Sequence, residues 1–108
     1  MTIQEFANLV TEHTKQDLIE QFGEESFERI HKIYAQTSVV IGKKYTKVDV
    51  GRSGKFMIDS EGNIFGIKAY GVIHRGHHYG TLETTSQYFW GSYYPQKIKS
   101  SAVESEAA

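Results

Sequence analysis

The sequence contains no cysteine, and this absence excludes disulfides, thiolate metal sites and cysteine nucleophiles. It also fits a reducing compartment. No apolar run is longer than four residues, whereas a membrane-spanning helix needs about 20. The first residues, MTIQEF, lack the basic start and apolar core of a signal peptide. We therefore expect a cytoplasmic protein without a membrane span.

The formal net charge is only −1, but the two halves of the chain differ in sign. Residues 1–42 hold three basic and seven acidic side chains, a balance of −4. Residues 43–99 hold nine basic and four acidic side chains, a balance of +5, and residues 100–108 add two glutamates. Since the local field decides which partners approach a surface, the basic second half is the part expected to meet an anionic partner.

Two helices are predicted at the start of the chain. Thr2 and Glu5 have the spacing of a capping box, in which each side chain accepts a hydrogen bond from the other residue's backbone amide. The apolar periodicity that follows either breaks near His13 or continues to Phe22, and Gly23 is a typical helix stop.

The second helix is expected to begin at Glu24 and to end within residues 36–38. Its predicted apolar stripe consists of Phe27, Ile30, His31 and Tyr34. Residues 39–41, Val-Val-Ile, fit either a last helical turn or a short buried strand.

Beyond residue 42 the periodicity changes to the alternation of β-strands. The expected strands are 43–50, 55–59, 64–70 with an extension to 74, 79–85 and 88–94, separated by turns at 51–54, 60–63, 75–78 and 86–87. The fold class is therefore α+β, with two N-terminal helices packed on an antiparallel β-meander of about five strands. Residues 1–99 form this single domain, and residues 100–108 are expected to be a disordered tail.

Aromatic and basic residues alternate along the expected sheet. One face must pack on the helices and is expected to use Phe65 and Ile67, so the opposite face presents other side chains. Aromatic rings interleaved with Lys and Arg bind single-stranded nucleic acid by stacking on bases and neutralising phosphates. An ordinary solvated face around a small core is the alternative. The predicted nucleic-acid-binding residues are Tyr45, Lys47, Arg52, Lys55, Lys68, Tyr70 and Arg75.

Three histidines, His74, His77 and His78, cluster at one expected turn. Two imidazoles at this spacing are candidate ligands for zinc or another divalent ion. No cysteine completes the set, and a polar hairpin tip is the simpler interpretation. The sequence therefore predicts no cofactor and no firm metal site.

Two other patterns suggest binding chemistry. The stretch 51–55, Gly-Arg-Ser-Gly-Lys, could hold a phosphate with its backbone amides and charges, although it lacks the spacing of a Walker A loop. A plain turn is the alternative. Asp49 and Asp59 lie on adjacent expected strands and could form a carboxylate pair, or each could form an ion pair with Lys47 or Lys55.

Residues 43–85 resemble a family of small proteins encoded by bacteriophages and mobile elements. The residues that carry the resemblance read KYTKVDVGRSGKFMIDSEGNIFGIKAYGVIH, against a family core of KYxKVDxGxSGKxMxDxxGxIxGIKxYGVIH. The helical first part and the tail lie outside the match. The resemblance implies a phage or mobile-element setting, in which nucleic-acid handling or inhibition of a host defence protein is expected.

Three functions are compatible with these patterns. The leading hypothesis is a non-catalytic binding module that engages DNA or RNA through its basic, aromatic sheet. The alternative is an inhibitor that binds a host protein through its acidic helices or through residues 88–94. The third is a small metal- or nucleotide-dependent enzyme that uses the turn 74–78. No enzyme signature of recognised specificity is present in the sequence.

Overall fold

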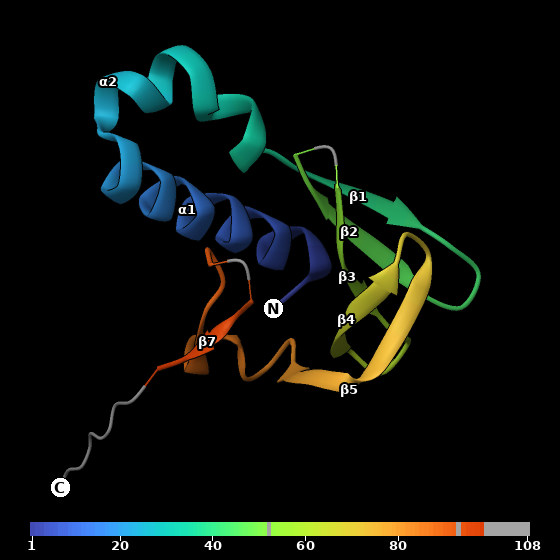
Figure 1. Ribbon diagram of the computed structural model, residues 1–108. Coiled ribbons are helices and arrows are strands. Elements are labelled where there is room, and N and C mark those ends of the chain that lie inside the picture. The colour runs from blue at the N-terminus through green and yellow to red at the C-terminus, as the bar shows by residue number, and fades with distance from the viewer. Residues whose placement is uncertain (52, 93, 99–108) are drawn as a thin grey trace, which may run out of the picture.

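Helical segments precede a five-stranded antiparallel sheet, as Figure 1 shows for the computed structural model. The structure describes residues 1–51, 53–92 and 94–98. The predicted α+β class is confirmed, whereas the predicted tail at 100–108 lies outside the described residues. The helical elements are α1 (Ile3–Phe22), α2 (Glu24–Ser26), η1 (Phe27–His31), η2 (Lys32–Ala35) and η3 (Thr85–Gln87). The strands are β1 (Thr37–Ile41), β2 (Thr46–Val50), β3 (Ser53–Ile58), β4 (Asn63–Ala69), β5 (Val72–Thr81), β6 (Tyr88–Phe89) and β7 (Gln96–Lys97).

Helix α1 begins and ends at the residues that the sequence predicts. The Thr2 hydroxyl accepts a hydrogen bond from the Glu5 amide at 3.0 Å, and the Glu5 carboxylate accepts one from the Thr2 amide at 2.8 Å. The helix continues without a break to Phe22 and ends at Gly23, whose φ of 86° suits glycine. Both caps of the first predicted helix are therefore confirmed.

The second helical segment is irregular rather than one regular helix. It consists of a single α-helical turn, the π-helical η1 and the 3-10 helix η2. Of the predicted apolar stripe, Phe27 is buried, but Ile30 and Tyr34 are 55% and 53% exposed. A π turn bonds residue i to i+5, so the residues after it leave the 3.6-residue periodicity on which the stripe was predicted.

The five strands β1 to β5 pair in sequence order, each antiparallel to the next. Residues 39–41, ambiguous in sequence, belong to β1, which pairs with β2 and is an edge strand. The strand expected from residue 43 begins only at Thr46. Between β3 and β4 the predicted hairpin turn is confirmed, with Gly62 at a φ of 86°.

The hairpin between β4 and β5 differs from the prediction. Ala69 pairs with Val72, so the turn consists of Tyr70 and Gly71. The turn predicted at 75–78 is wrong, because these residues lie inside β5. Three of them, 75–77, form a bulge between the pairs Gly66–His74 and Phe65–His78. A glycine among polar residues is typical of turns and of bulges alike, and only the strand pairing distinguishes them.

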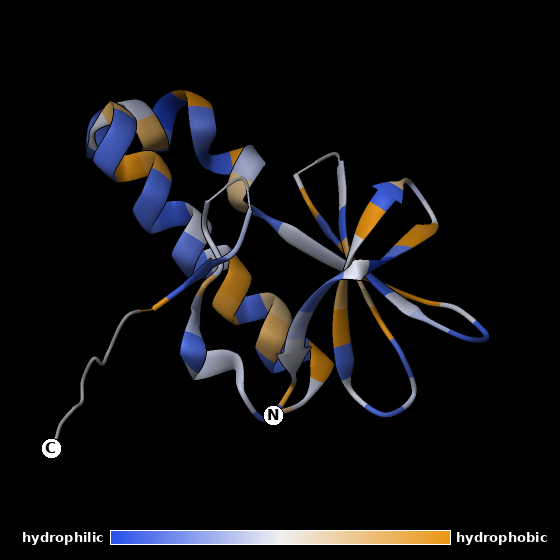
Figure 2. Cartoon of the chain, turned by 60° about the horizontal axis from the view of Figure 1, so that its bottom comes forward, coloured by the Kyte–Doolittle hydropathy of each residue, from blue (hydrophilic) through white to orange (hydrophobic). Residues whose placement is uncertain are grey.

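The hydrophobic core lies between α1 and one face of the sheet. Figure 2 shows apolar residues along both α1 and the strands. The fully buried side chains of the core cluster come from α1, from β2 to β4 and from the segment after η3. They are Phe6, Ala7, Val10, Val48, Phe56, Ile58, Ile64 and Trp90.

The segment after η3 completes the core instead of adding a strand to the sheet. The strand predicted at 88–94 is wrong: among the described residues of this range only Tyr88 and Phe89 form a strand, and they pair with β7 in a separate two-stranded ribbon. Trp90 is fully buried, its indole N–H donates to the Thr85 carbonyl at 3.0 Å, and its ring meets Phe6 edge to face at 4.8 Å. Burial of this large ring outweighs the extended preference of an aromatic run.

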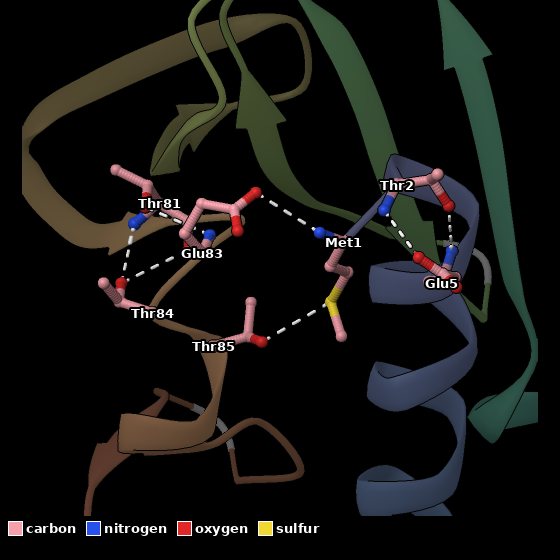
Figure 3. A network of polar contacts seen from close by, with 7 residues as sticks. All are labelled: Met1, Thr2, Glu5, Thr81, Glu83, Thr84 and Thr85. Carbon is pink, nitrogen blue, oxygen red and sulfur yellow. Dashed lines mark hydrogen bonds and ion pairs between the residues drawn. The ribbon is translucent and has the colours of Figure 1, made fainter.

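Polar contacts join the start of α1 to the segment after β5 (Figure 3). The amine of Met1 lies 3.3 Å from the carboxylate of Glu83, and the Thr85 hydroxyl lies 3.4 Å from the Met1 sulfur. The Thr81 amide donates to the Thr84 hydroxyl at 2.9 Å and shapes the turn that carries Glu83. These contacts hold the core segment beside α1.

Candidate nucleic-acid interface

One face of the sheet is left open by the helices. The described helical segments and the β6–β7 ribbon lie on the other side (Figure 1). Since Val48, Phe56 and Ile64 point to the core, the alternate positions point to the open face. We use "open face" for Tyr45, Lys47, Asp49, Met57, Phe65, Tyr70, Arg75 and His78. Strand register places four of these in one row across the sheet, in the order Lys47, Met57, Phe65 and His78.

A cation and a tyrosine are paired near β2. The Lys47 ammonium lies 4.9 Å from the ring centroid of Tyr70, and the Tyr70 hydroxyl donates to Asp49 at 3.1 Å. This hydrogen bond raises the pKa of Tyr70. Tyr70 comes from the β4–β5 turn and lies over Gly54, where an added Cβ would be 2.7 Å from its Cδ1 atom. Glycine at position 54 therefore allows the ring to approach the sheet.

A second pair of a cation and a tyrosine lies at the other end of β2. Arg75, from the β5 bulge, donates a hydrogen bond to the Tyr45 hydroxyl. Its guanidinium carbon is 5.8 Å from the Tyr45 ring centroid and 5.4 Å from that of Phe65. The Lys44 ammonium lies 5.8 Å from the same Tyr45 ring. Two of the expected tyrosines are therefore each in contact with a cation on the open face.

A small apolar cluster lies between these pairs. Phe65 and Met57 are neighbours by register and are only 7% and 4% exposed. The His78 ring stacks on Phe65 at 4.9 Å, and Arg75 lies over it. The prediction that Phe65 packs on the helices is wrong, because the adjacent residue Ile64 takes that place in the core. Phe65 is instead the support for the polar side chains of the open face.

The three histidines are divided between the two faces of the sheet. His74 and His77 stack at 4.0 Å on the helix side, where His77 lies near Tyr79, whereas His78 lies on the open face. Within residues 1–51, 53–92 and 94–98, no group of three or more His, Cys, Asp or Glu side chains could hold a metal ion. Alternation along β5 after the bulge explains why neighbours 77 and 78 point apart.

The other predicted nucleic-acid-binding residues are not among those of the open face. Lys68 is exposed within β4 at a register irregularity. Lys55 points to the helix side, where its ammonium donates to the Ser92 carbonyl at 2.9 Å. Arg52 lies outside the described residues.

The two aspartates do not form a pair. Asp49 is level with Gly54, five residues along β3 from Asp59, so about 16 Å of strand separates their levels. Asp59 accepts hydrogen bonds from the amides of Glu61 and Asn63 at 3.0 and 2.9 Å and shapes the hairpin turn. Partial burial acts to raise the pKa of Asp59, but these hydrogen bonds and the charge of Arg75 together lower it. Neither ion pair proposed for Lys47 and Lys55 is found among the described side chains.

The sequence analysis did not predict the roles of three open-face residues. Asp49 accepts the hydrogen bond of Tyr70, and His78 and Met57 belong to the row that crosses the sheet from Lys47. Alternation from Lys47 places Asp49 on the same face, so that signal was present. The row through His78 depends on a bulge in a distant strand, and no local pattern reveals it.

No protein-family model, curated protein or solved structure matches the chain. The resemblance to proteins of bacteriophages and mobile elements therefore stays a prediction. None of the helices that the structure describes is long and apolar enough to cross a membrane.

Proposed function

We propose that the open face binds single-stranded nucleic acid. The observation that carries this proposal is the pairing of Lys47 with Tyr70 and of Arg75 with Tyr45 on the face that the described helices leave open. Cations beside aromatic rings supply the two interactions that a single strand requires, phosphate neutralisation and base stacking. Tyr70 is exposed and Tyr45 is partly exposed. The module is expected to be non-catalytic.

The charges of the open face suggest a path for the strand. Asp49 repels phosphates near Gly54, whereas Lys44 and Arg75 attract them toward the Tyr45 end. The exposed Tyr70 ring, with 59% of its surface accessible, offers a platform for a base. A phosphate that approaches Arg75 competes with the Tyr45 hydroxyl for the guanidinium.

Fluorescence anisotropy with labelled oligothymidylate and oligouridylate tests the proposal. Tyr70→Ala should weaken binding by about fivefold or more at every salt concentration, because a stacked base contributes roughly 1–3 kcal/mol. Lys47→Met should weaken binding mainly at low salt and reduce the salt slope by about one. The matched control is Lys97→Met, on the ribbon at the helix side, which should leave binding unchanged.

Two results would overturn the proposal. One is the absence of binding by the intact protein at about 100 μM and low salt, already the weak end of non-specific association. The other is equal loss of affinity in the Lys97→Met control, which would mean that only overall charge matters. Melting temperatures of the three variants separate a binding defect from loss of fold.

A second candidate, inhibition of a host protein by direct binding, is favoured by a different observation. Apolar side chains of the second helical segment and of the end of α1 remain accessible: Phe22, Ile30, Ile33 and Tyr34 are 46–55% exposed. Such a cluster is typical of protein-binding surfaces. Ile30→Ser combined with Ile33→Ser should abolish capture of a host protein without affecting oligonucleotide binding. Capture through this surface should persist at high salt.

A further inference from the structure

A cleft opens on the helix side of the sheet, away from the open face. Its volume is about 340 Å³, within the range of sites for small ligands. It lies between α1, η2, parts of strands β2 to β5 and the segment around Gly91. We call it the Lys55 cleft, and its defining residues are Thr14, Tyr34, Val50, Lys55, His77 and Tyr79.

A β-bulge turns Lys55 into this cleft. Val48 pairs with Phe56 and Asp49 with Gly54, so Lys55 is the extra residue of β3 at this point. An extra residue disturbs the strict alternation of a strand. Lys55 therefore leaves the face on which alternation alone would place it, and its ammonium donates to the Ser92 carbonyl at 2.9 Å.

The ammonium of Lys55 has no anionic partner within the described part of the chain. No carboxylate oxygen of these residues lies within 4.0 Å of it, although the side chain is half-buried. Burial lowers the pKa of Lys55, and the more distant charge of Asp17 on α1 raises it by a smaller amount. A cation removed from water without a counter-ion is unfavourable, so an anion in the cleft would be stabilised.

A second polar group in the cleft also lacks a partner. Thr14 is 7% exposed, and its hydroxyl oxygen makes no hydrogen bond with any described residue. Buried hydroxyls are nearly always satisfied in native proteins, so this one can accept or donate a hydrogen bond to a ligand in the cleft. The remaining walls are largely aromatic or apolar, with Tyr79 and Val50 on the sheet side and Tyr34 on the helical side.

We propose that the Lys55 cleft binds a small organic oxyanion, a phosphate or carboxylate group on an aromatic or apolar body. Lys55 and Thr14 hold the oxyanion by hydrogen bonds, and the body lies against Tyr79 and Val50. This site is on the opposite side of the sheet from the proposed nucleic-acid interface and does not depend on it. It also includes part of the Gly-Arg-Ser-Gly-Lys stretch, whose Ser53, Gly54 and Lys55 line the cleft.

Nuclear magnetic resonance titrations test this site with four probes: phenyl phosphate, benzoate, inorganic phosphate and the uncharged benzyl alcohol. The amides of Gly54, Gly66 and Gly91 line the cleft and report binding in a sparse region of the nitrogen spectrum. Phenyl phosphate or benzoate should shift them saturably, with a Kd of about 1 mM or lower. Whichever of the two binds more tightly identifies the phosphate or the carboxylate as the preferred group. Inorganic phosphate should bind more weakly because it lacks the apolar body.

Two variants and one control decide the assignment. Lys55→Met keeps the length of the side chain and should weaken binding at least about tenfold, because a charge-assisted hydrogen bond is lost. Thr14→Val should weaken it about fivefold and serves if Lys55→Met does not fold. Lys47→Met, on the open face, should bind the probes as the wild type does.

Three results would overturn the proposal. They are the absence of saturable shifts with both organic anions, equal shifts with benzyl alcohol, and unchanged affinity in Lys55→Met or, if that variant does not fold, in Thr14→Val. Because Lys47→Met impairs only the open face, failure of oligonucleotide binding and failure of this site are observed separately.

Discussion

The two faces of the sheet contain similar residue types in opposite environments. On the helix side, Phe6, Phe56 and Trp90 are buried and contact one another edge to face at 4.8–5.6 Å. On the open face, Tyr45 and Tyr70 each contact a cation instead. The difference teaches that an aromatic ring in this sheet stabilises the fold where α1 covers it. On the face that the described helices leave open, the Tyr70 ring remains accessible to a ligand, with 59% of its surface exposed.

Lys47 and Lys55 show the same contrast for a charge. Lys47 follows the alternation of β2 and lies on the open face over Tyr70. Lys55 is displaced by the bulge and lies half-buried in the cleft. Both side chains are partly buried, but the bulge places Lys55 in the cleft, where burial lowers its pKa.

The largest expected effect comes from truncating a ring on the helix side. Phe56→Ala should lower the free energy of unfolding by about 3–5 kcal/mol, because it opens a cavity beside Trp90. Tyr70→Ala, on the open face, should cost less than about 1 kcal/mol. Urea denaturation of both variants measures the difference, and equal losses would contradict the contrast between the faces.

The next largest loss of stability is expected from adding a methyl group at a tightly packed glycine. A Cβ on Gly91 would lie 2.1 Å from the backbone oxygen of His13, so Gly91→Ala should cost about 1–3 kcal/mol through overpacking against α1. The control is Gly76→Ala in the β5 bulge, where the nearest atom, 3.0 Å away, belongs to the His74 ring and can move. Thermal unfolding should therefore rank Gly91→Ala well below Gly76→Ala in stability.

A pH-dependent effect is expected at the contact between α1 and the core segment. The Nδ1 atom of His13 accepts a hydrogen bond from the Trp90 amide at 2.9 Å, which requires an unprotonated acceptor. Burial lowers the pKa of His13 from its ordinary value of 6.5, against a smaller opposing effect of Glu12. The unfolded chain therefore binds this proton more tightly. The resulting stability is complete above pH 6.5 and is lost as the pH falls through the lower folded-state pKa.

His13→Asn isolates this contribution, since asparagine keeps an acceptor near the position of Nδ1 but does not titrate. Between pH 7.5 and 5 the wild type should lose about 1 kcal/mol more than the variant, the scale of one buried hydrogen bond. Chemical denaturation at several pH values measures it. Parallel pH profiles for both proteins would show that His13 is not the titrating group.

The smallest expected changes in stability are those of the two lysine variants, and they should differ in sign. Lys47→Met removes a partly exposed cation–π contact and should lower stability by about 0.5–1 kcal/mol. Lys55→Met removes an unpaired, half-buried charge and should leave stability unchanged or raise it by up to about 1 kcal/mol. Denaturation at low salt and without added anions gives both values. A loss from Lys55→Met that exceeds the loss from Lys47→Met would contradict the account of the cleft.

The sequence by itself determined the features that depend only on residues close together in the chain. The capping box of Thr2 and Glu5, the stop at Gly23 and the turn at Gly62 each depend on residues within one turn of each other. The change from helical to alternating periodicity near residue 40 likewise matches the observed start of the sheet at Thr37. These features and the α+β class could be predicted because their energies depend on neighbouring residues.

Only the tertiary structure decided which side chains face each other across strands. The position of the β4–β5 turn, the bulges in β3 and β5 and the burial of Trp90 depend on pairing and packing between residues far apart in the chain. A shift of one residue exchanges the two faces of a strand, so the sequence predicted Lys47 and Tyr70 correctly on one face but misplaced Phe65. The Lys55 cleft could not be foreseen, because α1, the sheet and the segment at Gly91 meet only in the folded chain.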